Sequence, residues 1–165
     1  MQTRFSVSDV KRITNCSRSN INYWRKTKLL NPEFSENGKN KKVYSIKDLF
    51  FIKLIKIFND YGLFSIVPKI IKYLDTVMTG YDSIDYIQKI AKENWCLVLC
   101  KPKLNELTET CYLWQMTKDI KTPEILINGK NAHCIAGTPN DFQLIFNISN
   151  IAYNILQGGE NEKKQ

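Results

Sequence analysis

The sequence predicts a mostly α-helical N-terminal part followed by a small α+β domain. Apolar residues recur at helical spacing through residues 7–74, with serines where helices would begin. A Lys-rich stretch with an Asn-Gly turn signal interrupts these helices at residues 37–42. After Trp95 the apolar period shortens, as expected for strands. Two helices joined by a tight turn, then a basic hairpin and two more helices, predict a winged helix-turn-helix at residues 1–76.

The composition is typical of a cytoplasmic globular protein. The 165 residues are 43% hydrophobic, enough for a sizeable core. No apolar run reaches membrane-spanning length, and the N-terminus lacks the apolar segment of a secretion signal, so we expect no membrane association. The five cysteines are an odd number that fits no closed disulfide framework, and we expect them to be reduced.

Positive charge is concentrated in the first half of the chain. Residues 1–76 hold 15 Lys and Arg against 6 Asp and Glu, whereas residues 77–165 hold 9 against 10. A basic surface attracts double-stranded DNA through the release of counterions. The alternative is a basic surface that only keeps the protein soluble. Because the charge coincides with the helix-turn-helix pattern, we favour DNA binding.

The first two helices have recognisable starts. Ser6, followed three residues later by an acid, can cap a helix over residues 7–14. Asn15-Cys16 forms the turn, and the small Cys16 side chain suits the helix crossing. Ser17 can cap the second helix over residues 18–26.

The second helix is the predicted reading helix. Ile21 and Trp24 lie three residues apart and should face the core, which leaves polar side chains on the other faces. Arginine suits guanine, asparagine suits adenine, and hydroxyls suit phosphate. An ordinary polar helix face is the alternative interpretation. The candidate DNA contacts are Arg18, Ser19, Asn20, Asn22 and Tyr23, with Arg4 and Arg25 as weaker candidates.

The basic hairpin is the predicted wing. Residues 29–32 end the second helix, and Asn37-Gly38 is a turn signal between two short strands. Lys41 and Lys42 follow the turn, and clustered ammonium groups on a protruding loop suit contact with phosphates. We therefore add both lysines to the candidate DNA contacts.

Two further helices complete the predicted reader. Ser45, again followed three residues later by an acid, should cap a long helix. The apolar residues of this helix cover a wide part of its surface, so we expect it to be buried on several sides. Tyr61-Gly62 should end it. Ser65 should cap the next helix, over residues 66–74.

This order of elements resembles the MerR family of transcription regulators over about residues 4–75. The resemblance implies a homodimer that binds an inverted repeat in DNA with its second helix and its wing. The family's Arg-Tyr pair on the second helix corresponds here to Asn22 and Tyr23, which favours a base contact by Asn22. The motifs that carry the resemblance are Phe5-Ser6-Val7, residues 17–24, Leu29-Leu30-Asn31-Pro32, Asn37-Gly38, Tyr44-Ser45-Ile46-Lys47-Asp48-Leu49 and residues 62–66.

Residues 77–157 form the predicted α+β domain, and residues 158–165 a flexible tail. We expect this domain to supply dimerisation or to bind a small-molecule or protein effector. Asp82 should cap its first helix and Ser149 its last. The expected helices are residues 83–94 and 150–156, and the expected strands are residues 96–100, 110–114, 124–127, 133–136 and 142–148.

Four cysteines and the only histidine fall in this second domain: Cys96, Cys100, Cys111, His133 and Cys134. Together they could hold a soft metal. The absence of a C-x-x-C pair favours buried structural thiols instead, so we predict no metal and no cofactor. With one histidine, no Gly-rich phosphate loop and no nucleophile motif, the sequence indicates no enzyme.

The prediction is therefore a DNA-binding transcription regulator. One alternative keeps DNA binding but assigns it to excision or partition of a mobile element. Another is a protein-interaction adaptor whose basic half is incidental. Clustered repeats at a recombination or partition site would favour the first alternative, and weak, sequence-blind binding that is lost at moderate salt would favour the second.

Overall fold

The computed structural model describes residues 4–34, 42–93, 95–101, 110–115, 125–128 and 142–160. The chain divides into two compact units, residues 1–89 with 151–165, and residues 90–150. The domain boundaries expected after residues 76 and 157 both fall inside helices. They differ from the observed division because the last helix belongs largely to the first unit, which a division made along the sequence does not anticipate.

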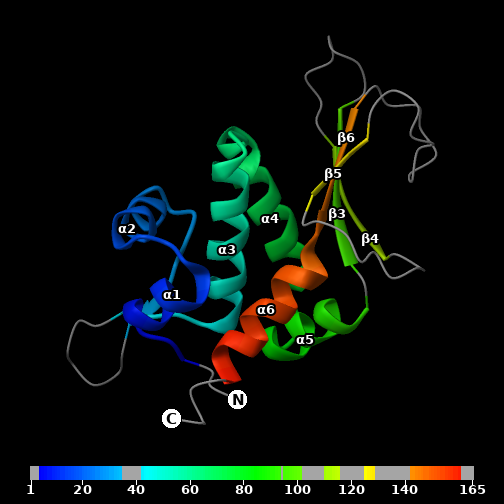
Figure 1. The fold of residues 1–165 in the computed structure, drawn as a ribbon. Coiled ribbons are helices and arrows are strands. Elements are labelled where there is room, and N and C mark those ends of the chain that lie inside the picture. Colours follow the sequence, from blue (N-terminus) through cyan, green and yellow to red (C-terminus); the bar gives the residue numbers. More distant parts are fainter. Residues whose placement is uncertain are drawn as a thin grey trace. The chain divides into compact units, whose positions relative to one another are not determined.

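The first unit contains the helix-turn-helix. Helices α1 and α2 lie beside the long helix α3 in Figure 1, and α4 follows α3. Strands β1 and β2 pair antiparallel, with Glu33 opposite Val43. The elements are α1 (Val7–Thr14), α2 (Arg18–Lys26), β1 (Glu33–Phe34), β2 (Lys42–Val43), α3 (Ile46–Asp60), the short 3-10 helix η1 (Phe64–Ile66), α4 (Val67–Met78) and α5 (Ser83–Lys92).

The predicted starts of α1 and α3 are confirmed as capping boxes. The Ser6 backbone N–H donates to Asp9 Oδ2 over 2.7 Å, and the Ser6 hydroxyl accepts from the Asp9 N–H. Ser45 and Asp48 repeat this arrangement, with the Ser45 N–H 2.8 Å from Asp48 Oδ2. Each box satisfies N–H groups that the first turn of a helix leaves without a partner.

Helix α3 is the centre of the core, as predicted. Nine of its 15 residues are buried, including Phe50 and Leu54 with no exposed surface. Phe5 and Tyr44 form a two-residue antiparallel bridge, in which each donates its backbone N–H to the other's carbonyl over 2.9 Å. Both side chains are buried in the core. This bridge joins the segment before α1 to the end of β2.

The start of α4 corrects one prediction. Ser65 does not cap this helix, since the chain first makes the 3-10 helix η1 and α4 has no side-chain cap. Pro68 occupies the first turn, where its missing N–H removes a donor that would have no partner in the helix. The helix continues past the predicted end at Leu74 because Met78 adds another buried turn.

The second unit contains a four-stranded antiparallel sheet in the order β4-β3-β6-β5. Leu97 of β3 pairs with Phe146 of β6, and both are fully buried. The predicted partner of β5, residues 133–136, lies outside the described residues, and β5 pairs with β6. The strands are β3 (Trp95–Lys101), β4 (Thr110–Gln115), β5 (Ile125–Asn128) and β6 (Phe142–Asn147).

Helix α6 (Ile148–Glu160) begins differently from the prediction. The buried Ser149 hydroxyl donates to Ile90 O and accepts from the Trp95 N–H, both over 2.5 Å. The cap comes from Asn147, whose Oδ1 accepts from the Asn150 N–H over 3.0 Å. Ser149 thus bonds to segments 54 and 59 residues away, a contact that local sequence does not reveal.

The predicted Asp82 cap of α5 is confirmed by the Ile84 N–H, 2.8 Å from Asp82 Oδ1.

The end of α6 belongs to the first unit. The predicted tail began at Gly158, but Gly158 and Gly159 are helical. A Cβ at Gly158 would lie 3.1 Å from Ile13 Cγ2, and one at Gly159 would lie 3.6 Å from the Phe5 ring. Small residues here let α6 approach α1 and Phe5 closely, so the helix extends past its predicted end at Leu156.

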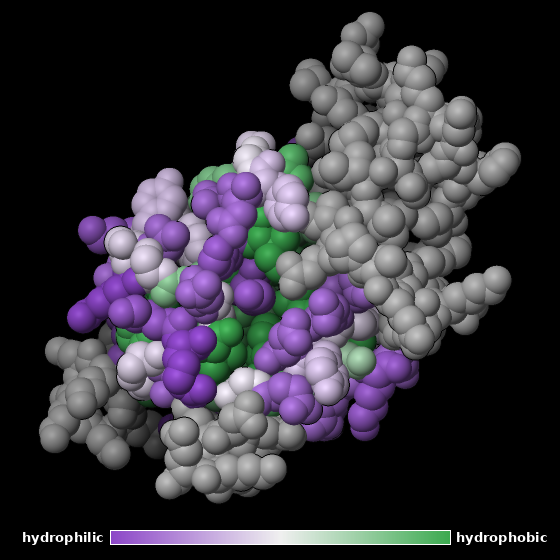
Figure 2. All heavy atoms as spheres, viewed as in Figure 1, coloured by the Kyte–Doolittle hydropathy of each residue, from purple (hydrophilic) through white to green (hydrophobic). Residues whose placement is uncertain are grey.

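Hydrophilic residues cover most of the coloured face in Figure 2, with apolar residues visible between them. Among the residues that the structure describes, no helix is long and apolar enough to span a membrane.

Candidate nucleic-acid interface

Helix α2 carries six of the side chains that the sequence assigned to DNA contact, and four of the six are exposed. Ile21 and Trp24 are 0% and 2% exposed and attach the helix to the core, as predicted. Tyr23 is 54% exposed. Arg18, Ser19 and Asn20 are also exposed, whereas Asn22 and Arg25 are half-buried. The polar residues of one short helix therefore share a solvent-facing surface.

The turn before α2 fixes how this surface is presented. Asn15 adopts a left-handed conformation with φ of 55°, which asparagine tolerates better than most residues. Cys16 is 3% exposed, and its thiol lies 3.8 Å from Thr14 O and 4.0 Å from Ile52 O of α3. Burial raises the pKa of the Cys16 thiol, so it is protonated at neutral pH. Cys16 is the buried packing thiol that the sequence predicted.

The cap of α2 lacks the acid found in α1 and α3. The Ser17 hydroxyl accepts from the Asn20 N–H over 3.1 Å, as predicted, but position N3 holds Asn20 in place of aspartate. The first turn of α2 contains no acidic residue. Negative charge at a helix N-terminus stabilises the helix but would repel a phosphate. The start of α2 is therefore compatible with a polyanion.

The hairpin strands bring further basic residues to the first unit. Lys42 is half-buried at the start of β2 and makes contacts of its own, and Arg4 is exposed next to the Phe5 bridge. Lys41 and the predicted turn at residues 37–38 lie outside the described residues.

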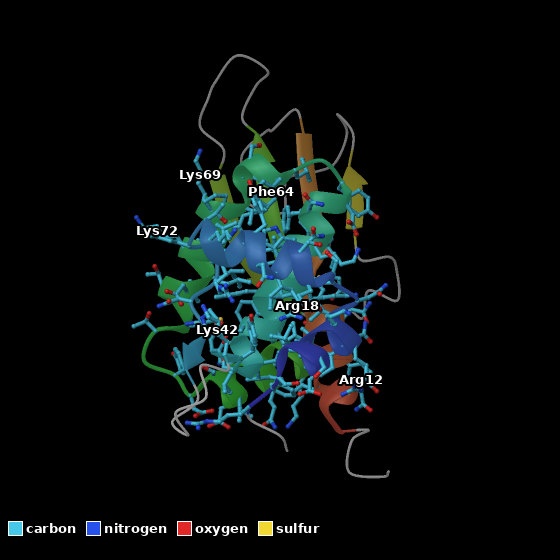
Figure 3. All side chains as sticks on the ribbon, turned by 90° about the vertical axis from the view of Figure 1, so that its left-hand side faces the viewer. Arg12, Arg18, Lys42, Phe64, Lys69 and Lys72 are labelled. Atoms are coloured by element: carbon cyan, nitrogen blue, oxygen red, sulfur yellow. The ribbon has the colours of Figure 1, made fainter. Side chains whose placement is uncertain are left out.

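Two lysines that the sequence prediction missed lie on α4. Lys69 and Lys72 are exposed and project away from the ribbon in Figure 3, which views the side of the molecule that carries α2. Arg18 and Lys42 appear on the same side. Lys69 and Lys72 are three residues apart in the sequence and lie off the buried stripe of α4. This spacing could have indicated that they share a helix face. Their orientation relative to α2 depends on the tertiary packing of α4.

Four acids of residues 4–76 have partners within the structure. Asp9 and Asp48 complete capping boxes, as described above. Asp60 and Asp75 each pair with a lysine of α3, Lys56 and Lys47 respectively.

The described residues contain no group of three or more His, Cys, Asp or Glu side chains placed to hold a metal ion. Cys96, Cys100 and Cys111 are in β3 and β4, and only their backbone is described, while His133 and Cys134 lie outside the described residues.

Comparison with known proteins finds a similarity for part of the first unit. Residues 5–74 match the model of the MerR HTH family regulatory proteins. No curated protein matches the chain significantly. The matched segment runs from Phe5 through α1, α2, the hairpin strands and α3 to Leu74 in α4. Residues 5–74 therefore resemble the helix-turn-helix domain of the MerR family regulatory proteins.

Proposed function

We propose that this protein is a sequence-specific transcription regulator that acts in the cytoplasm as a homodimer on an inverted repeat. The family match to residues 5–74 is the observation that carries the proposal. Helix α2 enters the major groove, where Arg18, Ser19, Asn20 and Asn22 contact bases or phosphates. The second unit supplies dimerisation or binds an effector.

The β1–β2 hairpin acts as a wing on the DNA backbone. Its strands pair antiparallel, Lys42 begins the second of them, and Lys41 precedes Lys42 in the sequence. Lys69 and Lys72 add phosphate contacts from α4, because Lys72 lines a groove that Lys28, just after the end of α2, also lines. Arg4 and Arg25 are weaker candidates. Such contacts fix the register of a protein on DNA without reading its sequence.

The salt dependence of DNA binding tests this placement. Lys69→Ala with Lys72→Ala should flatten the slope of log affinity against log salt by about 1 to 2, measured on a duplex of mixed sequence. Lys42→Ala should flatten it by about 1 at most.

Lys89 and Lys92 of α5 provide a matched control, because they are also exposed and three residues apart on a helix. Replacing both by alanine removes the same charge and should leave the slope unchanged. Equal effects of the two pairs would show that net charge alone governs binding, and would remove the α4 lysines from the interface.

A further inference from the structure

An aromatic contact joins the reading helix to the junction between α3 and α4. The rings of Tyr23 and Phe64 have centroids 6.1 Å apart and planes inclined by 38°, a separation within the range of interacting aromatic pairs. The two residues are 41 positions apart in the sequence. The contact is therefore tertiary, between α2 and η1.

The backbone at the junction directs Phe64 toward α2. Helix α3 ends at Asp60, Tyr61 is its C-cap, and Gly62 follows with φ of 72°, a conformation that glycine adopts without strain. The Leu63 N–H donates to Phe58 O over 2.8 Å, which fixes the chain immediately before η1. Phe64 is half-buried and also lines a groove together with Pro68 and Lys72 of α4. The Phe64 ring is thus partly shielded by the fold, and it meets the Tyr23 ring.

The Tyr23 side chain needs such a support. It stands 54% exposed on the surface that we assign to DNA, and an exposed side chain without neighbours samples several rotamers. Its own backbone is fixed, because Tyr23 O accepts from the Thr27 N–H and hydroxyl at the end of α2. The orientation of the phenol ring then depends on the side-chain torsions, which a neighbouring ring restricts.

We infer that Phe64 is a positioning residue for DNA binding, whose ring holds Tyr23 in the orientation in which the tyrosine hydroxyl meets a phosphate of the DNA backbone. This inference rests on the proposed function. A side chain that is ordered before binding loses less conformational entropy when the complex forms. Phe64 itself touches no DNA in this arrangement and acts only through Tyr23.

The test is a double-mutant cycle on the full chain, with the duplex enriched from a random pool as the probe. Phe64→Leu keeps an apolar side chain but removes the ring, and should weaken binding about 2- to 10-fold. Phe64→Tyr keeps the ring and should bind like the unmodified protein. Tyr23→Phe removes only the hydroxyl, and in that background Phe64→Leu should cause no further loss.

Tyr86→Leu is the matched control, because Tyr86 is the buried ring beneath another exposed tyrosine, Tyr81, at 5.2 Å and 41°. This variant removes the inner ring of a similar aromatic pair, from α5, and should leave DNA affinity unchanged. Thermal unfolding of every variant reports whether the fold is intact, and the Phe64→Tyr rescue distinguishes loss of the ring from general damage.

The inference is overturned if Phe64→Leu binds like the unmodified chain, or if it weakens binding equally with and without the Tyr23 hydroxyl. Either result leaves the proposed function standing, since the unmodified chain still selects a DNA sequence. If the unmodified chain enriches no sequence, the proposed function fails and the positioning role fails with it.

Discussion

Helices α2 and α3 belong to the same unit and both start at a serine cap, yet they differ in what surrounds them. Helix α3 buries nine of 15 residues, whereas α2 buries only Ile21 and Trp24 of nine. Helix α3 also completes its cap with Asp48, while α2 has Asn20 at the matching position. Helix α3 therefore contributes mainly to stability. Helix α2 lacks both that burial and the stabilising acid, and its surface faces solvent.

This difference separates two kinds of substitution. Changes in α3 should alter the free energy of unfolding and affect DNA only through loss of the fold. Changes on the exposed face of α2 should alter DNA binding at nearly constant stability. The predictions below begin with the largest expected effect.

Phe50→Ala should destabilise the protein most. The Phe50 side chain is fully buried on α3, and truncation of such a ring costs about 3–5 kcal/mol through lost burial and an unfilled cavity. Denaturant unfolding measures this loss. Tyr23→Ala on α2 should cost about 1 kcal/mol or less, because the ring is half exposed. Similar losses for the two variants would contradict the division between the helices.

Gly158→Leu should lower the free energy of unfolding by about 1–3 kcal/mol through overpacking. A Cβ added at this position would lie 3.1 Å from Ile13 Cγ2 of α1, so a larger side chain must displace one of the helices. Gln157→Leu, exposed on the same helix, is the control and should be tolerated. Shortening the partner with Ile13→Ala should recover part of the loss. If both glycine and glutamine variants unfold alike, α6 does not close on α1.

Asn22→Ala should change which base is preferred at one position of the binding site. An asparagine that bonds adenine in the major groove discriminates by about 1–3 kcal/mol, and alanine removes that discrimination. The stability of the fold should change little, since Asn22 is only half-buried. Competition among single-base variants of the site provides the measurement. A uniform loss at every base would mean that Asn22 contacts the backbone.

Asn20→Asp should have the smallest and the most informative effect. It supplies the acid that α2 lacks at N3, and should stabilise the helix by about 0.3–1 kcal/mol. The same charge should weaken DNA binding most strongly at low salt, because salt screens its repulsion of phosphate. Asn20→Ala provides the comparison, since it removes the amide without adding charge. Equal affinity of the two variants at low salt would place the start of α2 away from the DNA backbone.

The parts of the fold that depend on neighbouring residues could be predicted from the sequence. Ser6 and Ser45 are each followed at the third position by an acid, and both capping boxes are present. The pair Ile21 and Trp24 indicated the buried side of α2 from spacing alone, which in turn left the exposed residues as candidates.

The parts that depend on distant residues could not be predicted. Ser149 has the local features of a cap, but its hydroxyl serves Ile90 and Trp95 instead. Gly158 and Gly159 have the low helix propensity of a frayed end, but contacts with Ile13 and Phe5 keep them in α6. The lysines of α4 and the support of Tyr23 by Phe64 were missed for the same reason, because the packing of α4 and η1 beside α2 is not encoded in any local pattern.

The most direct test of the central claim, that α2 reads DNA as part of a dimeric regulator, is selection from a random pool of duplexes at physiological salt. The account predicts enrichment of an inverted repeat whose half-sites lie about one helical turn of DNA apart or a multiple of it. Enrichment of no sequence, with binding that disappears as salt rises, would contradict it. The basic side of the first unit would then be a surface that attracts any polyanion.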